Sequence, residues 1–310
     1  MDDGFTMARP GFLTVDVETL LATEFPPREM VLSPFLPVKG LAMIYGPRGI
    51  GKTHMSLGIA YAVATGGTFL RWTAPRPRRV LLIDGEMPGV VLQERLAAIV
   101  KAEGKEPPSP DFLRVLAMDM QDGINLDLSN PGSHPALDAA IDGAELLIVD
   151  NISTLASSGR ENEAESWLPI QQWGLRQRRA ERAVLFIHHA GKGGQQRGTS
   201  RREDVLDTVV ALRRPADFQP DQGARFEVHF EKNRGFYGDD AKPFEAALTT
   251  SAGWTTRDLE DADIARVMVL TGQGMTVRDI AEELGMSKST VSRMQKKGAA
   301  LIATPPYPHD

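Results

Sequence analysis

The residues most clearly suited to chemistry are 46–53, which read GPRGIGKT and match the spacing G-x-x-x-x-G-K-[ST]. The glycines can adopt backbone angles that other residues avoid, so successive N–H groups turn inward around a phosphate. Lys52 would reach the outer phosphates and the Thr53 hydroxyl would bind Mg²⁺. The pattern predicts an ATP and Mg²⁺ site whose nucleotide-binding residues are Gly46, Pro47, Arg48, Gly49, Ile50, Gly51, Lys52, Thr53 and His54.

Carboxylates that suit the metal and the attacking water follow two other apolar runs. Asp150 ends LLIVD and is the expected second-sphere partner of Mg²⁺, whereas Thr53 would bind the ion directly. Asn151 follows it, so this run supplies no general base. Glu86, in LLIDGEMP, is the expected base, aimed at the water by a strand adjacent to the phosphate-loop strand. The alternative is that Asp84 and Glu86 are only polar residues of a loop.

These polar groups would be positioned by apolar strands that alternate with helices. Strands are expected at 41–45, 80–84, 112–118, 145–150 and 183–188, and helices at 53–64, 90–103 and 163–180. Such alternation predicts an α/β fold, a mostly parallel sheet with helices on both faces. The segment RFEVHFEK (225–232) alternates apolar and polar residues, which is typical of an antiparallel strand with one wet face.

Composition excludes several classes of protein. The 310 residues are 42% apolar and 25% charged, and none is cysteine, which excludes disulfides, thiolate catalysis, zinc fingers and iron–sulfur clusters. His188 and His189 would point to opposite faces of a strand and cannot share a metal. No run approaches the ~18–20 apolar residues of a membrane span, and the N-terminus does not resemble a secretion signal. We expect a cytoplasmic protein without a membrane partner.

The chain is long enough for two domains, and its pattern changes near the C-terminus. We expect an extended, proline-punctuated lead-in at 1–39, a nucleotide-binding domain at 40–250, a linker at 251–262 and a small all-α domain at 263–310. The net charge of −6 does not favour nucleic-acid binding by the molecule as a whole, so such binding must come from local basic patches.

The final domain has the spacing of a helix-turn-helix. Its predicted apolar positions are Ile280, Leu284, Met286, Val291 and Met294, with Ala281 at the helix crossing and Gly285 in the turn. Ser287 can cap the second helix. The pattern resembles the DNA-binding helices of many bacterial regulators and resolvases, and the alternative is a hairpin that packs on the core or on another subunit. The resemblance implies DNA contacts from exposed Lys288, Ser289, Thr290 and Arg293.

The motifs GPRGIGKT, DGEMP, LLIVDN, IHHAGKGG and RGTS occur in this order. Their order resembles the RepA-like plasmid helicases, within the RecA-type P-loop ATPases, over about residues 28–250. The resemblance implies a RecA-like fold, a homo-oligomer in the form of a hexameric ring, and single-stranded DNA as partner. Duplex DNA would be the partner of the C-terminal helices, a module that a RepA-like helicase does not need.

The resemblance also implies roles for residues outside the phosphate site. His188 or His189 would sense the γ-phosphate, or would be satisfied by backbone groups. Lys232 and Arg234 would reach the nucleotide of a neighbouring subunit, or would lie in solvent on a basic hairpin. The loop AGKGGQQRGTSRRE would grip single-stranded DNA, or would be a solvated surface loop; its basic residues are Lys192, Arg197, Arg201 and Arg202.

Three functions fit these motifs. The first is an oligomeric ATP-driven motor on single-stranded DNA that serves replication of a plasmid or mobile element. The second is an ATP-switched regulator whose C-terminal helices bind duplex DNA. The third is a RecA-like recombination accessory that separates no strands.

Overall fold

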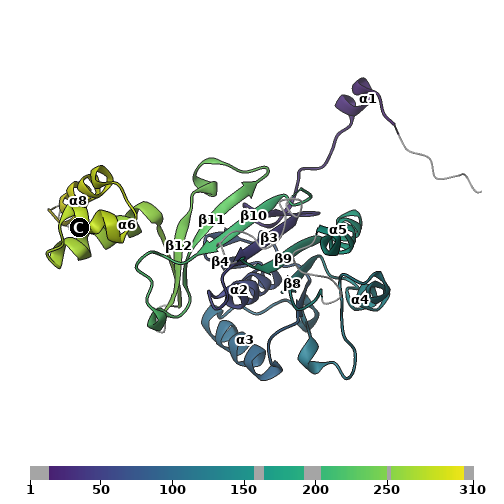
Figure 1. The fold of residues 1–310 in the computed structure, drawn as a ribbon. Coiled ribbons are helices and arrows are strands. Elements are labelled where there is room, and N and C mark those ends of the chain that lie inside the picture. Colours follow the sequence, from purple (N-terminus) through teal and green to yellow (C-terminus); the bar gives the residue numbers. More distant parts are fainter. Residues whose placement is uncertain (1–13, 157–163, 192–203, 250–252, 304–310) are drawn as a thin grey trace, which may run out of the picture.

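The computed structural model describes residues 14–156, 164–191, 204–249 and 253–303, and its central element is a nine-stranded sheet (Figure 1). The strand order is β13-β12-β11-β10-β3-β9-β8-β6-β7. The six strands from β10 to β7 pair in parallel, whereas β11, β12 and β13 pair antiparallel. The bounds are β3 (Leu41–Gly46), β6 (Val80–Asp84), β7 (Leu113–Ala117), β8 (Leu146–Asp150), β9 (Ala183–His189), β10 (Thr208–Arg213), β11 (Arg225–Asn233), β12 (Phe244–Thr249) and β13 (Gly253–Asp258).

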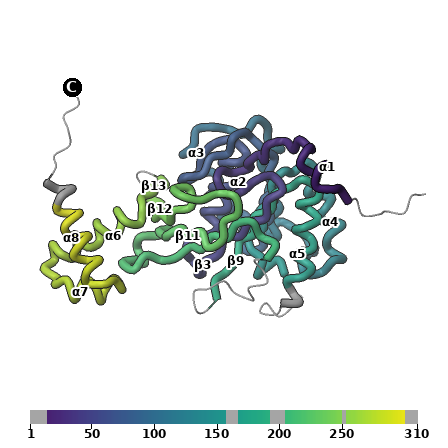
Figure 2. The backbone as a smooth tube through the Cα atoms, turned by 90° about the horizontal axis from the view of Figure 1, so that it is seen from above, coloured from purple at the N-terminus to yellow at the C-terminus, as the bar shows by residue number. Residues whose placement is uncertain are grey.

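Helices cover both faces of the parallel strands (Figures 1 and 2). In β3, Ala42 and Ile44 pack in the cluster that includes α2 (Lys52–Thr65) and α3 (Gly89–Glu103). Leu41 and Met43, on the opposite face, pack in the cluster that includes α4 (His134–Ala140) and α5 (Ala164–Arg179). The predicted fold class, a RecA-like P-loop core with a mostly parallel sheet, is confirmed.

The position of β6 differs from the prediction. The strand that carries Glu86 was expected beside the phosphate-loop strand, but β9 and β8 lie between β3 and β6. The chain passes from β6 outward to the edge strand β7 and then returns through β8 and β9 toward β3. Because the carboxyl ends of all these parallel strands meet at one edge, residues beyond β6 still lie near the phosphate loop.

The N-terminal part is not a wholly extended lead-in. Its described residues include helix α1 (Val17–Ala22) and two short paired strands, β1 (Met30–Leu32) and β2 (Leu36–Pro37). Helix α1 buries none of its residues and projects away from the body of the molecule (Figure 1). A second hairpin, β4 (Thr68–Phe69) with β5 (Trp72–Thr73), follows α2.

The C-terminal helices form a lobe with its own core, next to β12 (Figures 1 and 2). They are α6 (Leu259–Gly272), α7 (Val277–Glu283) and α8 (Lys288–Ala303). The expected linker is wrong for residues 253–262, which form β13 and the start of α6. Thr255 and Thr256 pair with Ala247 and Ala246 of β12, so the segment completes the sheet. No helix among the described residues has the length and apolar character to cross a membrane.

Candidate nucleotide site and DNA-binding helices

The phosphate loop, residues 46–51, joins the carboxyl end of β3 to the amino end of α2. Gly49 and Gly51 have φ angles of +70° and +110°, in a region that residues with a Cβ rarely adopt. The first N–H groups of a helix have no partner within the helix, so the start of α2 presents donors to an anion. The loop therefore has the local geometry of a phosphate cradle.

Lys52 is folded against this loop and is only 6% exposed. Its Nζ donates to the carbonyl oxygens of Gly46 (2.9 Å) and Pro47 (2.8 Å). Burial lowers the pKa of Lys52 to about 8, although Asp150 and Glu86 act in the opposite direction. A bound polyphosphate would favour the charged form of this ammonium.

Asp150 lies at the end of β8, on the face of the sheet that packs against α2. Its Oδ2 accepts a hydrogen bond from Ser56 Oγ (2.6 Å), one turn after Thr53 on α2. Burial raises the pKa of Asp150 to about 6, while the Ser56 hydrogen bond lowers it. Ser56 was not among the residues expected from the sequence, although it lies one turn after Thr53 on the helix expected at 53–64.

Glu86 reaches the same edge from the turn after β6. Its Oε2 accepts a hydrogen bond from Asn151 Nδ2 (2.5 Å) and lies 3.7 Å from His189 Nε2. The Glu86 side chain is 54% exposed, so the carboxylate is held but still accessible. Asn151 was noted in the sequence only because it is not a second acid, and its contact with Glu86 was missed.

Asp84 orders the turn that carries Glu86. Its Oδ1 accepts from the backbone N–H groups of Glu86 (3.1 Å) and Met87 (2.7 Å). Asp84 is 1% exposed, and this burial raises its pKa. Its position indicates that Asp84 shapes the loop, whereas Glu86 lines the cavity.

The two histidines at the end of β9 lie on opposite faces of the sheet. His188 is fully buried and follows Phe186 on the face packed against α5, in register with Tyr45. His189 follows Ile187 on the face packed against α2 and lines the nucleotide cavity. Of the two histidines expected to sense the phosphate, it is therefore His189 that faces the cavity.

A cavity of about 620 Å³ opens between these groups. Its lining includes the predicted residues Gly49, Gly51, Lys52, Thr53, His54, Glu86, Asp150 and His189. Burial lowers the pKa of His54, and the charge of Arg95 acts in the same direction. The other predicted loop residues do not line it: Ile50 is buried, Arg48 is exposed, and Gly46 and Pro47 accept from Lys52.

The cavity has a second wall that sequence analysis did not find, the segment 214–224 between β10 and β11. Arg214, Phe218, Pro220, Gly223 and Ala224 line the cavity. The Arg214 guanidinium lies over the Phe218 ring, 4.2 Å from its centroid. The β10–β11 hairpin lies next to β3 because of the order of the strands in the sheet, and no local sequence pattern predicts that order.

Thr53 and Asp150 are suitable for Mg²⁺. Both line the cavity, and a hydroxyl with a carboxylate is the kind of oxygen ligand that this ion takes. Within the described ranges, no group of three or more His, Cys, Asp or Glu side chains could hold a metal ion. An ion at Thr53 and Asp150 would therefore depend on oxygens of the phosphates and of water.

Lys232 and Arg234 lie away from the cavity of their own chain. The pair Asn233–Thr208 is level with Ala42 near the start of β3, whereas the phosphate loop follows Gly46 at the other end of that strand. Arg234 is exposed just beyond β11, and its Nη2 donates to the carbonyl oxygen of Asp204 (3.5 Å). The predicted DNA-loop residues Lys192, Arg197, Arg201 and Arg202 lie outside the described residues.

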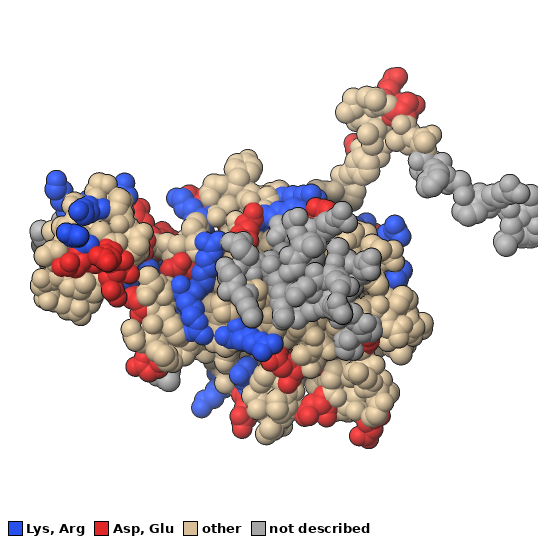
Figure 3. All heavy atoms as spheres, viewed as in Figure 1, with Lys and Arg blue, Asp and Glu red and all other residues tan. Residues whose placement is uncertain are grey.

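The C-terminal lobe contains the predicted helix-turn-helix. Ile280, Leu284, Val291 and Met294 are buried together, and Gly285 has a φ of +62° in the turn. Ser287 Oγ accepts from the Thr290 N–H (3.1 Å) and caps α8 as predicted. Lys288, Ser289 and Arg293 are exposed on α8 and Thr290 is half-buried. Figure 3 shows basic and acidic side chains side by side on the viewed face of this lobe.

Comparison with known proteins identifies both parts. Residues 7–195 match the family model of the AAA domain, and residues 247–299 match that of a homeodomain-like domain. Among solved structures, the chain is similar to the KaiC-like protein PH0186 from the hyperthermophilic archaeon Pyrococcus horikoshii OT3, with 15% identity, a TM-score of 0.49, and coverage of 73% of this chain and 93% of that one. No curated protein matches the sequence. The match to the AAA domain covers residues 7–195, more than half of the chain, so the chain belongs to the AAA domain family.

Proposed function

We propose that this protein is an oligomeric motor that hydrolyses ATP with Mg²⁺ and acts on single-stranded DNA, as the RepA-like helicases do. The observation that carries the proposal is the shared cavity: Glu86, Lys52 and Asp150 come from three separate segments and face one space beside the phosphate loop. Replication of a plasmid or other mobile element is the process that the resemblance to RepA-like helicases suggests.

Glu86 acts as the general base in this proposal. Its carboxylate takes a proton from the attacking water, while the hydrogen bond from Asn151 fixes which oxygen faces the ligand. His189 is the proposed sensor, supported by its place in the cavity lining 3.7 Å from Glu86: its neutral imidazole would form a hydrogen bond to the outer phosphate. Lys52 exchanges its contacts with Gly46 and Pro47 for phosphate oxygens.

Thr53 and Asp150 would hold the metal. Bound Mg²⁺ supplies positive charge that offsets the charge of the phosphate oxygens. Ser56 keeps the Asp150 carboxylate oriented through its hydrogen bond. Phe218 and Arg214, stacked on each other, give the cavity an aromatic surface that fits a nucleobase.

Lys232 and Arg234 act on the nucleotide of the next subunit. Arg234 is level with the start of β3, so five residues of strand, about 16 Å, separate it from the phosphate loop of its own chain. Opposite edges that carry complementary halves of a site produce head-to-tail contacts, which form a ring when the rotation between subunits closes and a filament when it does not. This separation supports a hexameric ring in which each site uses cations from its neighbour.

The test is ATP hydrolysis by the full chain, with single-stranded DNA, with duplex DNA and without DNA, together with the particle mass in each mixture. The proposal expects assembly with ATP and single-stranded DNA, and hydrolysis that rises with assembly. Hydrolysis that single-stranded DNA does not change, by a particle that stays monomeric, would contradict it.

The folded helix-turn-helix favours a second function, an ATP-switched regulator that binds duplex DNA. Two of its four predicted contacts, Lys288 and Arg293, are exposed cations on α8, as a recognition helix requires. In this case ATP would control duplex binding, and single-stranded DNA would not stimulate hydrolysis. Removal of residues 263–310 is a poor test, because it also removes buried Arg266 from the edge of the core, so point variants of α8 are preferable.

A further inference from the structure

The loop 214–224 has two sides with different partners. On one side, Phe218, Gly223 and Ala224 line the nucleotide cavity. On the other side, the neighbouring residues Asp217 and Gln222 accept hydrogen bonds from Arg225 of β11, at 2.9 Å and 2.8 Å. A change on the cavity side of this short loop therefore acts on the contacts of the opposite side.

The same loop packs directly against the phosphate loop. A Cβ on Gly51 would lie 3.1 Å from the Cβ of Ala224, closer than side chains ordinarily approach, so Ala224 packs tightly against the phosphate loop. Arg214 Nη2 donates to the carbonyl oxygen of Gly49 (3.5 Å). Groups that bind phosphate thus contact loop 214–224 without an intervening layer.

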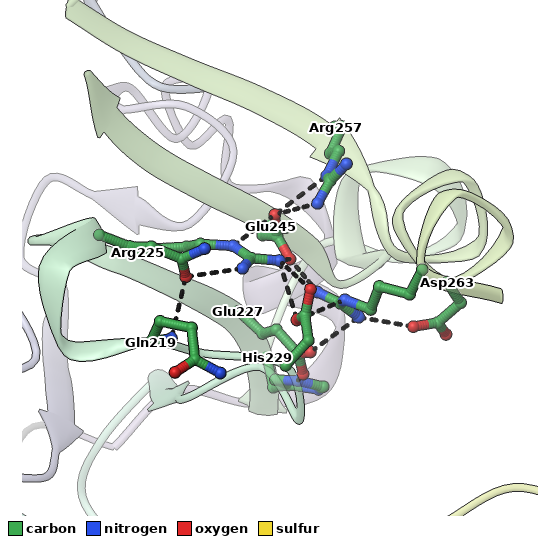
Figure 4. A network of polar contacts seen from close by, with 10 residues as sticks. Gln219, Arg225, Glu227, His229, Glu245, Arg257 and Asp263 are labelled. Atoms are coloured by element: carbon green, nitrogen blue, oxygen red, sulfur yellow. Dashed lines mark hydrogen bonds and ion pairs between the residues drawn. The ribbon is translucent and has the colours of Figure 1, made fainter. Parts of the chain in front are cut away.

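Beyond the loop, an ionic cluster connects the sheet to the C-terminal lobe (Figure 4). Its centre is Glu245 of β12, which is 3% exposed and contacts three arginines. Arg225 Nη2 lies 3.2 Å and Arg257 Nη2 lies 2.7 Å from the Glu245 carboxylate, and Arg266 donates to it as well. Figure 4 shows Glu245 between β11, β13 and α6.

Arg266 carries the connection into the lobe. It belongs to α6, is 6% exposed, and contacts Asp217 (2.8 Å), Asp263 (2.6 Å) and Glu227 (3.5 Å) besides Glu245. The adjacent residue Val267 is fully buried in the core of the helix-turn-helix. One guanidinium therefore joins the loop at the nucleotide cavity to the first helix of the predicted DNA-binding lobe.

Because its charges are buried, this connection is expected to have a few distinct arrangements. Arg266 shares its buried charge among Asp217 and three other carboxylates, so a movement of Asp217 changes the balance of attraction on the guanidinium and favours a rearrangement of Arg266 or of its other partners. Packed groups of this kind switch between arrangements and do not deform smoothly. The cluster meets the requirement for coupling, a physical element whose arrangement both sites can bias.

We propose that loop 214–224 and the Glu245–Arg266 cluster couple nucleotide binding in the cavity to duplex DNA binding by α7 and α8. The inference rests on the proposed nucleotide and DNA binding, and it adds the route by which each affects the other. Because coupling is reciprocal, duplex DNA must change the nucleotide affinity by the same factor as nucleotide changes the DNA affinity.

The test uses the full chain and a fluorescent duplex of random sequence, titrated without nucleotide, with Mg²⁺–ADP and with a non-hydrolysable Mg²⁺–ATP analogue. For the unaltered protein we expect nucleotide to change the duplex dissociation constant by at least about fivefold, the lower end of typical coupling. Asp217→Asn keeps the shape of a side chain that is 36% exposed and removes its charge. We expect Asp217→Asn to bring the ratio of the duplex dissociation constants with and without nucleotide close to one.

The matched control is Asp239→Asn, which removes the charge of a 90% exposed carboxylate paired with Lys242. It should leave the ratio unchanged. A ratio of one in the unaltered protein, or an unchanged ratio in Asp217→Asn, overturns the inference. Duplex and nucleotide binding in the same titrations would still support the two binding activities on which the inference rests.

Hydrogen exchange covers the case in which the duplex does not bind, an outcome that would count against duplex binding by α8 and leave the proposed motor on single-stranded DNA untouched. Mg²⁺–ADP should slow amide exchange in the phosphate loop and in α6 of the unaltered protein. In Asp217→Asn the phosphate loop should still be protected and α6 should no longer respond. The coupling is overturned if nucleotide does not change amide exchange in α6 of the unaltered protein. It is also overturned if nucleotide changes this exchange equally in both proteins.

Discussion

The nucleotide cavity and the Glu245–Arg266 cluster both gather charged side chains on the same sheet, but they use them in opposite ways. In the cavity, Glu86 accepts a hydrogen bond from Asn151 and remains 54% exposed toward a space of about 620 Å³. In the cluster, Glu245 is 3% exposed and contacts three arginines of its own chain.

The difference shows how to separate ligand-binding charges from structural ones. Charges that are matched within the protein stabilise one arrangement of elements, here β11, β12 and α6. Charges that face a cavity keep part of their interaction capacity for a ligand. The two regions meet at loop 214–224, where Phe218 lines the cavity and Asp217 belongs to the cluster.

The strongest test of this difference is to neutralise the Glu86 carboxylate in the cavity. Glu86→Gln should lower the rate of ATP hydrolysis by about 10²- to 10⁴-fold, because the water loses its base, with little change in ATP affinity. Steady-state hydrolysis and equilibrium binding of ATP measure the two effects. Glu94→Gln, an exposed acid on α3 that does not line the cavity, is the control. Full turnover in Glu86→Gln would refute the assignment.

The equivalent change in the cluster should act on stability. Glu245→Gln removes the negative charge shared by buried Arg225 and Arg266, and should lower the free energy of unfolding by about 3–5 kcal/mol. Glu181→Gln, whose 73% exposed carboxylate pairs with Lys39, should cost less than about 1 kcal/mol. Denaturant titration of both variants gives the comparison, and equal costs would mean that the cluster does not hold the elements together.

The pH dependence sharpens the description of the cavity. Asp150, with a pKa of about 6, loses its charge and its use as a metal ligand below that pH. Lys52, with a pKa of about 8, loses its charge above that pH, so Mg²⁺–ATP affinity should be greatest between these values. Each limb should fall by up to about tenfold per pH unit.

The nucleotide titrates as well, so a variant is needed to distinguish its titration from that of Asp150. Ser56→Ala is that variant. Without its hydrogen bond the pKa of Asp150 rises further, so the acid limb should move to higher pH while the basic limb stays in place. If the binding profiles of the two proteins coincide at every pH, the titration of Asp150 does not cause the acid limb.

The smallest effects are expected on the exposed helix α8. Lys288→Ala and Arg293→Ala should each weaken binding of duplex DNA and reduce its salt dependence by about one phosphate contact. Lys101→Ala, an exposed cation of α3, should leave both unchanged. Affinities measured at several salt concentrations decide the point, and an unaltered salt slope in both α8 variants would argue against DNA contact there.

Local patterns predicted what depends on neighbours in sequence. The phosphate loop, the strand that ends at Asp150, the Ser287 cap and the buried face of Ile280 and Leu284 are all set by spacing along the chain. The opposite orientation of His188 and His189 follows from the two-residue repeat of a strand, but which of them faces α2 required the packing of the sheet.

What the sequence did not predict depends on distant contacts. The strand order that puts β9 and β8 between β3 and β6 leaves no trace in the motif that ends at Glu86. Residues 253–258 look like a polar linker, yet they form an edge strand because β12 offers them a partner. The four carboxylates around Arg266 come from 217 to 263, so its role became visible only in the folded chain.

The central claim is that each nucleotide site joins the cavity of one subunit to the cations of the next, and mixing two inactive variants tests it most directly. Lys52→Ala spoils the cavity and Arg234→Ala spoils the donated cation, so neither alone should hydrolyse ATP. In randomly mixed rings about a quarter of the interfaces combine an intact cavity with an intact cation. The account predicts that activity returns on mixing, and two variants that stay inactive together would contradict it.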